Sequence, residues 1–444
     1  MRGLLLLVSA SALCASDLRL VDAIKRRDHK AVTTLMSQKA DVNATQPDGA
    51  TPLAWAAYLG DRDTAEALLK AGAKVETTDE YGETPLTLAC ATGDAVLVGK
   101  LLEKGANPNA ARWNGETALM IAANTGSVEA VKLLLDKGAK IDAAEQGKGQ
   151  TALMWAASEG HSDVVKLLIA KGANVKAASK SGFTPLVFAA AKDDPESVAA
   201  LLAAGADPNT TLADGVKALN VAASFKASKA AMALLDGGAD PNVADRGGNS
   251  PLHIAAQAGE VDLVKKLLAK GAHPNARTAK AQTGGRGGGG GGGFFRFVAG
   301  EQTPLMLAAK ANQVETMRLL IAGGADPKLR AQDGSSLLMA AAGSGHVQAV
   351  KFAFEYDPDA KVATDTGTTA MHAAVTGTMQ LATQPEICEV IQFLADKGAP
   401  LDEKDARGRT PIAVADVLPI DKAVELLTSL IEKSGAKPKI PSKR

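Results

Sequence analysis

Histidine, cysteine and acidic residues are the side chains that could do catalytic or metal chemistry in this chain. No two of the six histidines have the spacing that metal ligands need. No Gly-x-Ser-x-Gly sequence marks a nucleophilic serine, and no cysteine accompanies a histidine in a recognisable pattern. The acidic residues are scattered rather than paired. The sequence therefore predicts no enzyme, no metal site and no cofactor. The histidines are His29, His161, His253, His273, His346 and His372.

The elements that carry these residues form a repeat, which is clearest in residues 249–277. Ser250 and Pro251 can begin a helix, because serine caps the free N–H groups and proline suits the first helical position. Gly259 can end that helix. A second helix follows with an apolar stripe, and Gly271 ends it. Neither helix can bury its stripe alone, so the pair needs neighbours.

Those neighbours are present at a nearly constant period. Seven of the ten intervals between equivalent positions are 33 residues and one is 34, whereas the other two, 53 and 41, contain insertions. Such a period predicts a stacked array of helical hairpins. The positions equivalent to Ser250 are Thr51, Thr84, Thr117, Thr151, Thr184, Lys217, Thr303, Ser336, Thr369 and Thr410.

The repeated residues resemble those of the ankyrin repeat family. The resemblance rests on TPLAWAAYLGD (51–61), TPLTLACATGD (84–94) and SPLHIAAQAGE (250–260), and on the exit sequences KGANPNA, AGADPN and GGADPN. It implies an all-α ankyrin-repeat solenoid of about eleven helix-turn-helix repeats plus an N-terminal cap, with hairpin loops along one edge. It also gives His253 and His372 a structural hydrogen-bonding role. The family binds many unrelated partners, so the resemblance does not identify one.

The predicted organisation has six parts. Residues 1–16 read as a secretory signal peptide, because an apolar run follows Arg2 and small residues come after it. Cys14 leaves open a lipid anchor, although the bulky Leu13 argues against one. No later stretch is apolar enough to span a membrane. The other parts are a cap (17–46), repeats 1–7 (47–280), a glycine-rich flexible insertion (281–302), repeats 8–11 (303–436) and a basic disordered tail (437–444).

Two places in the array depart from the repeat. The sixth repeat has Lys217 where a capping threonine is expected, and residues 224–228 lack the turn glycine. The insertion contains the tract Gly287–Gly293, followed by Phe294, Phe295 and Phe297. Without Gly-Lys-Ser/Thr at the start of a helix, this tract is no phosphate-binding loop. Both places are expected to be soft joints of the array.

Cysteine usage points to packing rather than to disulfides. Beyond Cys14, the chain has only Cys90 and Cys388, which lie too far apart to meet in a linear stack. Cys90 occupies the second small position of the first helix. We therefore expect a buried thiol without reactivity.

The remaining candidates for function lie on the surface. Lysine plus arginine equals aspartate plus glutamate at 49 each, so no net charge favours nucleic acid. The family resemblance implies that partners contact the loop tips and the end of each first helix. Aromatic side chains at such places dominate binding energies elsewhere, although they could instead pack on neighbouring tips. The candidate protein-binding residues are Tyr58, Tyr81, Trp113, Asn114, Glu116, Lys148, Gln150, Phe183, Phe225 and Arg246.

The favoured function is a non-catalytic protein-binding scaffold of the bacterial cell envelope, periplasmic or secreted, which binds a partner protein through its loop tips and concave helix surface. Export and the glycine tract resemble exported bacterial ankyrin-repeat proteins. Two alternatives remain open, a secreted effector that binds host proteins and an accessory or regulatory subunit of a periplasmic enzyme. The partner's identity does not follow from the residues.

Overall fold

The structure is a computed structural model that describes residues 17–212, 215–281, 300–376 and 382–438. The predicted signal peptide with Cys14, the glycine tract with its three phenylalanines, residues 377–381 of the tenth repeat and residues 439–444 of the tail lie outside these ranges. Contacts divide the chain into two compact units. Unit 1 comprises residues 1–188 and 203–206, and unit 2 comprises residues 189–202 and 207–444.

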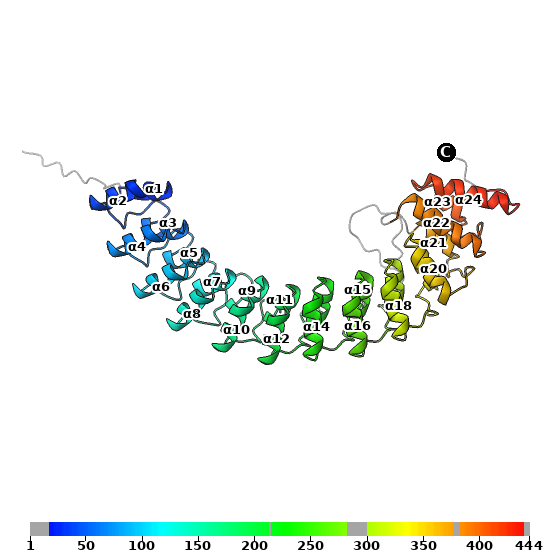
Figure 1. Ribbon diagram of the computed structural model, residues 1–444, viewed down its shortest axis with the longest axis horizontal. Helices are drawn as coiled ribbons and strands as arrows, with labels where there is room; N and C mark the ends of the chain where they lie inside the picture. Colours follow the sequence, from blue (N-terminus) through cyan, green and yellow to red (C-terminus); the bar gives the residue numbers. More distant parts are fainter. Residues whose placement is uncertain (1–16, 213–214, 282–299, 377–381, 439–444) are drawn as a thin grey trace, which may run out of the picture. The chain divides into compact units, whose positions relative to one another are not determined.

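The described residues form 24 helices, which follow one another in pairs (Figure 1). The cap and the first four repeats contain α1 Arg19–Lys25, α2 His29–Ser37, α3 Pro52–Tyr58, α4 Arg62–Lys70, α5 Pro85–Ala91, α6 Ala95–Glu103, α7 Ala118–Asn124, α8 Val128–Asp136, α9 Ala152–Glu159 and α10 Ser162–Ala170. The pair of the fifth repeat, α11 Pro185–Ala191 and α12 Pro195–Ala203, contains the boundary between the two units. The later repeats contain α13 Ala218–Ser224, α14 Ser228–Asp236, α15 Pro251–Ala258, α16 Val261–Ala269, α17 Pro304–Lys310, α18 Val314–Ala322, α19 Leu337–Ala342, α20 Val347–Tyr356, α21 Ala370–Thr376, α22 Gln384–Asp396, α23 Pro411–Ala415 and α24 Asp421–Lys433.

Each first helix begins at the residue that the period predicts. Thr51 Oγ1 accepts a hydrogen bond from the Ala54 N–H at 3.2 Å, and Thr84 Oγ1 accepts one from Thr87 at 3.1 Å. These bonds satisfy N–H groups that the helix itself leaves free. Within each unit, first helices pack on first helices and second helices on second helices, as α3 does with α5 and α6 with α8. The prediction of an all-helical ankyrin-type array is confirmed.

Asparagine side chains tie neighbouring repeats together where the chain leaves each second helix. Asn109 Oδ1 accepts from the Lys140 N–H at 2.8 Å, and its Nδ2 donates to the Gly138 carbonyl at 3.2 Å. Asn242 makes the same two bonds to His273 and Gly271. Each amide thereby satisfies backbone groups that would otherwise be unpaired at the edge of the stack.

The sixth repeat folds in spite of its missing cap. Lys217 makes no side-chain cap bond, yet α13 spans seven residues. Lys226 takes the left-handed turn with φ 57°, as Asp193 and Asn312 do in the fifth and eighth repeats, where six other repeats have glycine. Asn220 is buried and its Nδ2 donates to the Asn249 carbonyl of the next repeat at 3.2 Å. This contact to the neighbour stabilises a helix whose own sequence begins it poorly.

The glycine-rich insertion does not separate the repeats on either side of it. It enters at a loop tip. The Thr278 N–H donates to the Gln302 carbonyl at 3.0 Å. This hydrogen bond is equivalent to the one between the Asp79 N–H and the Glu83 carbonyl, which closes the tip of the second repeat. Asn275 still bonds both the Gly324 carbonyl and the Asp326 N–H, and α15 packs on α17. Repeats 7 and 8 therefore pack as direct neighbours, and the soft joint expected at the insertion stays a prediction for hydrogen exchange.

Shortening the insertion tests whether residues 282–299 contribute to the stability of the repeat array. We expect replacement of residues 282–299 by two glycines to raise the free energy of unfolding by no more than about 2 kcal/mol, because each halving of the loop length lowers the closure cost by about 0.6 kcal/mol. The bridge needed is short, since Ala281 and Gly300 are adjacent at the base of the loop. Urea unfolding followed by circular dichroism measures the difference. A loss of several kcal/mol would show that the insertion supports the stack.

Candidate functional site

The loop tips of unit 1 form a row in which each tip is bonded to the next. The Glu80 N–H donates to the Asp48 carbonyl at 2.7 Å, and the Trp113 N–H donates to the Tyr81 carbonyl at 3.2 Å. Gln146 to Asn114 and Lys180 to Lys148 continue the row at 2.9 and 2.8 Å. Each tip is also closed by its own turn. The side chains on this row are therefore held in fixed register.

Three predicted aromatic residues of unit 1 are exposed. Tyr81 and Trp113 extend from neighbouring tips with 68% and 71% of their side chains exposed, and Tyr58 at the end of α3 is 59% exposed. The indole of Trp113 lies against Gly82, where an added Cβ would come within 2.1 Å of the ring and where φ is 78°. Glycine is thus required there, both for the turn and for the close approach of the ring.

Other predicted residues are placed differently. The half-buried ring of Phe183 packs on Phe188, with ring centroids 5.7 Å apart, so this aromatic does pack on its neighbour. Glu116 is an ion-pair partner of Arg112, and the half-buried Gln150 shapes its own loop by backbone bonds to Glu145. These three side chains have roles in packing and turn geometry, and their part in recognition stays a prediction.

The remaining predicted residues are exposed and are divided between the two units. Asn114 and Lys148 lie on the tip row of unit 1. Phe225 and Arg246 belong to unit 2, where Phe225 is 68% exposed after α13 and Arg246 lies on a tip. The site of unit 1 therefore retains Tyr58, Tyr81, Trp113, Asn114 and Lys148.

A strip of half-exposed apolar side chains along the first helices was not predicted. It occupies the position four residues after the capping threonine in repeats 1, 2, 4 and 5, whereas the equivalent Ile121 of the third repeat is buried. At that position Trp55 donates its Nε1–H to Gln46 at 2.6 Å, contacts the Tyr58 ring edge-on at 5.6 Å and carries Lys25 over its face at 4.5 Å. With Trp113, this places all three tryptophans of the chain on the tips and first helices of unit 1. The strip consists of Trp55, Leu88, Trp155 and Phe188.

Charges along the tip row change sign. Arg112 lies between two carboxylates, with Nε 2.7 Å from Glu83 and Nη1 2.7 Å from Glu116. Burial disfavours the charged form of the Glu145 carboxyl, but backbone N–H bonds to it outweigh this effect and lower its pKa. Lys148 and Lys180 follow in the next two tips. The row is thus acidic at its start and basic at its end.

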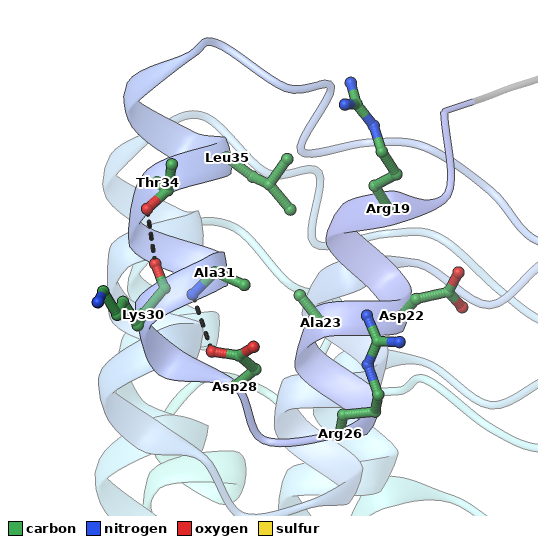
Figure 2. A pocket seen from close by; sticks show the side chains of 9 residues that line it. All are labelled: Arg19, Asp22, Ala23, Arg26, Asp28, Lys30, Ala31, Thr34 and Leu35. Atoms are coloured by element: carbon green, nitrogen blue, oxygen red, sulfur yellow. Dashed lines mark hydrogen bonds between the residues drawn. The ribbon is translucent and has the colours of Figure 1, made fainter.

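The cap carries an open recess between α1 and α2, on the face that a preceding repeat would cover. Its volume is about 470 Å³. Figure 2 shows its small apolar floor, with Ala23 and Leu35, and the charged side chains around it. The polar rim suits the end of a solenoid, which has to meet solvent. The rim residues are Arg19, Asp22, Arg26, Asp28 and Lys30.

Residues suited to chemistry are placed as packing groups. Within the described ranges, no three histidine, cysteine, aspartate or glutamate residues come together as a metal site. The His253 Nδ1 accepts from the Ser250 N–H at 3.1 Å, so its Nε2–H donates to the Gln302 carbonyl at 3.0 Å. His372 repeats this arrangement with Thr369 and Arg409. The structural role that the resemblance implied for both histidines is confirmed.

These two histidines predict an acid-sensitive stability. Burial lowers the pKa of both below the ordinary value of 6.5, and protonation of Nδ1 would place its N–H against a backbone N–H. Below pH 6.5 the unfolded chain therefore binds protons that the native chain does not, and stability falls as the pH falls. The slope is up to about 1.4 kcal/mol per pH unit for each histidine.

Urea unfolding between pH 7.5 and 5.5 measures this slope. The matched variant is His253→Asn with His372→Asn, since Asn220 already makes the equivalent bond in the sixth repeat. We expect the variant to have a flatter pH profile. An unchanged slope would assign the acid sensitivity to other groups.

Cys90 is fully buried on α5, as expected from its position. Burial raises the pKa of its thiol to about 12, so almost no thiolate exists near neutral pH. We expect a thiol reagent to modify Cys388, which is half-buried, long before Cys90. We expect Cys90→Ala to be nearly neutral and Cys90→Leu to cost about 1–3 kcal/mol by overpacking. Rapid labelling of Cys90 in the native protein would contradict its burial.

Comparison with known proteins identifies the family. The family model described as ankyrin repeats (3 copies) matches residues 20–112, 72–145, 94–179, 142–211, 186–278 and 305–383. The chain therefore belongs to the ankyrin repeat family. The crystal structure of the human ASB11 ankyrin repeat domain is 32% identical in sequence, over 50% of this chain and 98% of that domain, with a TM-score of 0.45. Among the described residues, no helix is both long and apolar enough to cross a bilayer.

Proposed function

We propose that this protein is a non-catalytic scaffold that binds a partner protein through the tip row and first helices of unit 1. The observation that carries the proposal is the exposure of Tyr81 and Trp113 on tips that backbone hydrogen bonds hold together. Side chains that are already ordered lose little entropy when a partner binds. Tyrosine and tryptophan are also the residues that contribute most at protein interfaces.

The strip on the first helices extends the same surface. Trp55, Leu88 and Trp155 are each partly exposed, so a partner that contacts the tips can also bury apolar area beside them. Together, tips and strip provide aromatic anchors beside polar groups, as protein interfaces do.

The proposed location is the bacterial cell envelope. It rests on residues 1–16, whose Arg2, apolar run and small residues have the order of a secretory signal peptide. Sequencing the N-terminus of protein from its native cell tests this part. Export predicts a mature N-terminus between Ala15 and Leu18, acylated Cys14 would indicate a lipoprotein, and an intact Met1 would contradict export.

Partner binding is tested separately, by purifying the tagged protein from native envelopes and identifying proteins that co-purify with it. The Tyr81→Ala, Trp113→Ala double variant serves as the control. A partner recovered with the wild type and absent with the variant supports the scaffold. A partner from host cells would favour a secreted effector, and a periplasmic enzyme would favour an accessory subunit. Equal recovery with both forms would contradict the assignment of the tips.

A further inference from the structure

The exposed aromatic pair of unit 1 lies in the most acidic part of the tip row. Asp48, Asp79 and Glu80 belong to the first two tips, immediately before Tyr81. Within the described part of the chain, none of these three carboxylates has an ion-pair partner. Asp79 Oδ1 instead accepts the N–H groups of Tyr81 and Glu83 at 2.9 and 2.8 Å, and Asp48 Oδ1 accepts the Ala50 N–H at 2.9 Å. Such turn-closing bonds keep a carboxylate ionised and fixed in place.

Arg112, the cation on the third tip, is already neutralised. The Arg112 guanidinium contacts both Glu83 and Glu116 at 2.7 Å, and these two carboxylates more than balance its charge. The lysines of the row come later, at Lys148 and Lys180. The surface around the two aromatic rings is therefore net negative.

The pKa of the Tyr81 phenol reflects the same negative electrostatic potential. A hydrogen bond to the Glu80 carboxylate, with the charges of Glu80, Asp79 and Asp48, raises the pKa of Tyr81 above its usual range. The ring itself remains 68% exposed. The indole of Trp113 has one edge against Gly82 and 71% of its surface free. Two open aromatic faces thus lie beside carboxylates that have no counter-ion.

Aromatic rings bind cations over their faces, and nearby carboxylates strengthen this attraction. The chain uses the first of these contacts within itself, since the Lys25 ammonium lies 4.5 Å from the centre of the Trp55 ring. An anionic segment would be repelled from the tips of repeats 1–3, and an uncharged one would leave the carboxylates uncompensated. Charge complementarity therefore favours a positively charged segment of the partner at these tips.

We infer that the tips of repeats 1–3 bind a basic segment of the partner protein, with a lysine or arginine side chain held over the Tyr81 and Trp113 rings and paired with Glu80. This inference rests on the proposed function and specifies the chemistry of its partner. The basic end of the row, at Lys148 and Lys180, would then face a less basic part of the same partner. The segment is recognised by its charge and by the flat faces of the two rings.

The test uses short peptides as probes. One is an acetylated and amidated Gly-Ser peptide with two arginines, and its match carries citrulline, which has the same shape without the charge. Binding to the full chain is followed by the NMR signals of the indole N–H groups, with Trp113→Phe identifying the signal of Trp113. We expect the arginine peptide to shift that signal, more strongly at low salt. The citrulline peptide should leave it unchanged.

Two exposed-site variants make the test specific. We expect Glu80→Gln to weaken binding of the arginine peptide about three- to tenfold. Glu103→Gln, the same substitution at an exposed position on the second helix α6, is the matched control and should not weaken it. Equal binding of the arginine and citrulline peptides, or unchanged affinity in Glu80→Gln, would overturn the inference.

The same experiments separate this inference from the proposed function. If the native partner depends on Tyr81 and Trp113 but contacts them through a neutral or acidic segment, the basic-segment inference fails and the scaffold assignment stands. If the partner binds without these two residues, the assignment of the tips itself fails. Peptide titration and partner capture thus have different outcomes in the two cases.

Discussion

Leu134→Ala is expected to lower the free energy of unfolding by about 2–5 kcal/mol, because it opens a cavity in a close-packed core. Leu134 is fully buried on α8, a helix that packs against α6, α7 and α10. In a solenoid each repeat contacts only its neighbours, so the loss falls on the third repeat and those beside it. The tip of that repeat carries Trp113, and the variant should therefore also loosen the proposed site.

The matched control is Leu135→Ala on the same helix. Leu135 is only half-buried, so its truncation removes less apolar area and should cost less than half as much. Urea unfolding measures both variants, and hydrogen exchange locates the loss. Equal destabilisation by the two variants would contradict the packing described for α8.

Truncation of the tip aromatics should have the largest effect on partner binding. We expect Tyr81→Ala and Trp113→Ala each to weaken binding about 30-fold or more, the effect of losing an interface residue that contributes about 2 kcal/mol. Both side chains are mostly exposed, so neither substitution should unfold the array. Deletion of residues 284–297 should matter less, because ordering a glycine tract costs about 1–2 kcal/mol per residue.

The controls are exposed apolar residues on second helices. Val96 and Val128 are 48% and 39% exposed on α6 and α8, away from the tip row. Their replacement by alanine should change affinity by less than twofold. If the valine variants or the loop deletion abolish binding while both tip variants retain it, the partner uses another surface.

The helix pairs could be predicted from the sequence because each repeat contains residues that mark where its helices begin and end. A capping threonine, a proline at the first helical position and a closing glycine recur with one period, and Thr51 and Thr84 act as that pattern predicts. The burial of Cys90 followed from its register in the same way. Lys217 shows the limit of local reasoning, because α13 forms without a cap once Asn220 bonds to the next repeat.

The candidate site was only partly predictable, because exposure depends on how neighbouring repeats pack. Phe183 and Trp113 both lie at tips, yet one ring packs on Phe188 and the other stays open over Gly82. Trp55 and Trp155 were missed because their position reads as core within a single repeat. Comparing that position across repeats, where it is always apolar and often aromatic, could have indicated the strip.

The location of the insertion could not be judged from its length. The tract looked like a joint because glycine cannot hold a fixed conformation, but its base closes through the Thr278–Gln302 pair at a loop tip. For packing between repeats, the position at which an insertion joins the array matters more than the length of the insertion.

Site-specific photo-crosslinking in the native cell shows whether the tip row of unit 1 is the partner-binding surface. A photoreactive residue replaces either Asn114, exposed on the tip beside Trp113, or Lys132, exposed on the second helix of the same repeat. We expect a discrete crosslinked partner from position 114 that disappears when Tyr81 is changed to alanine, and none from position 132. A partner crosslinked from position 132 and not from position 114 would contradict this expectation.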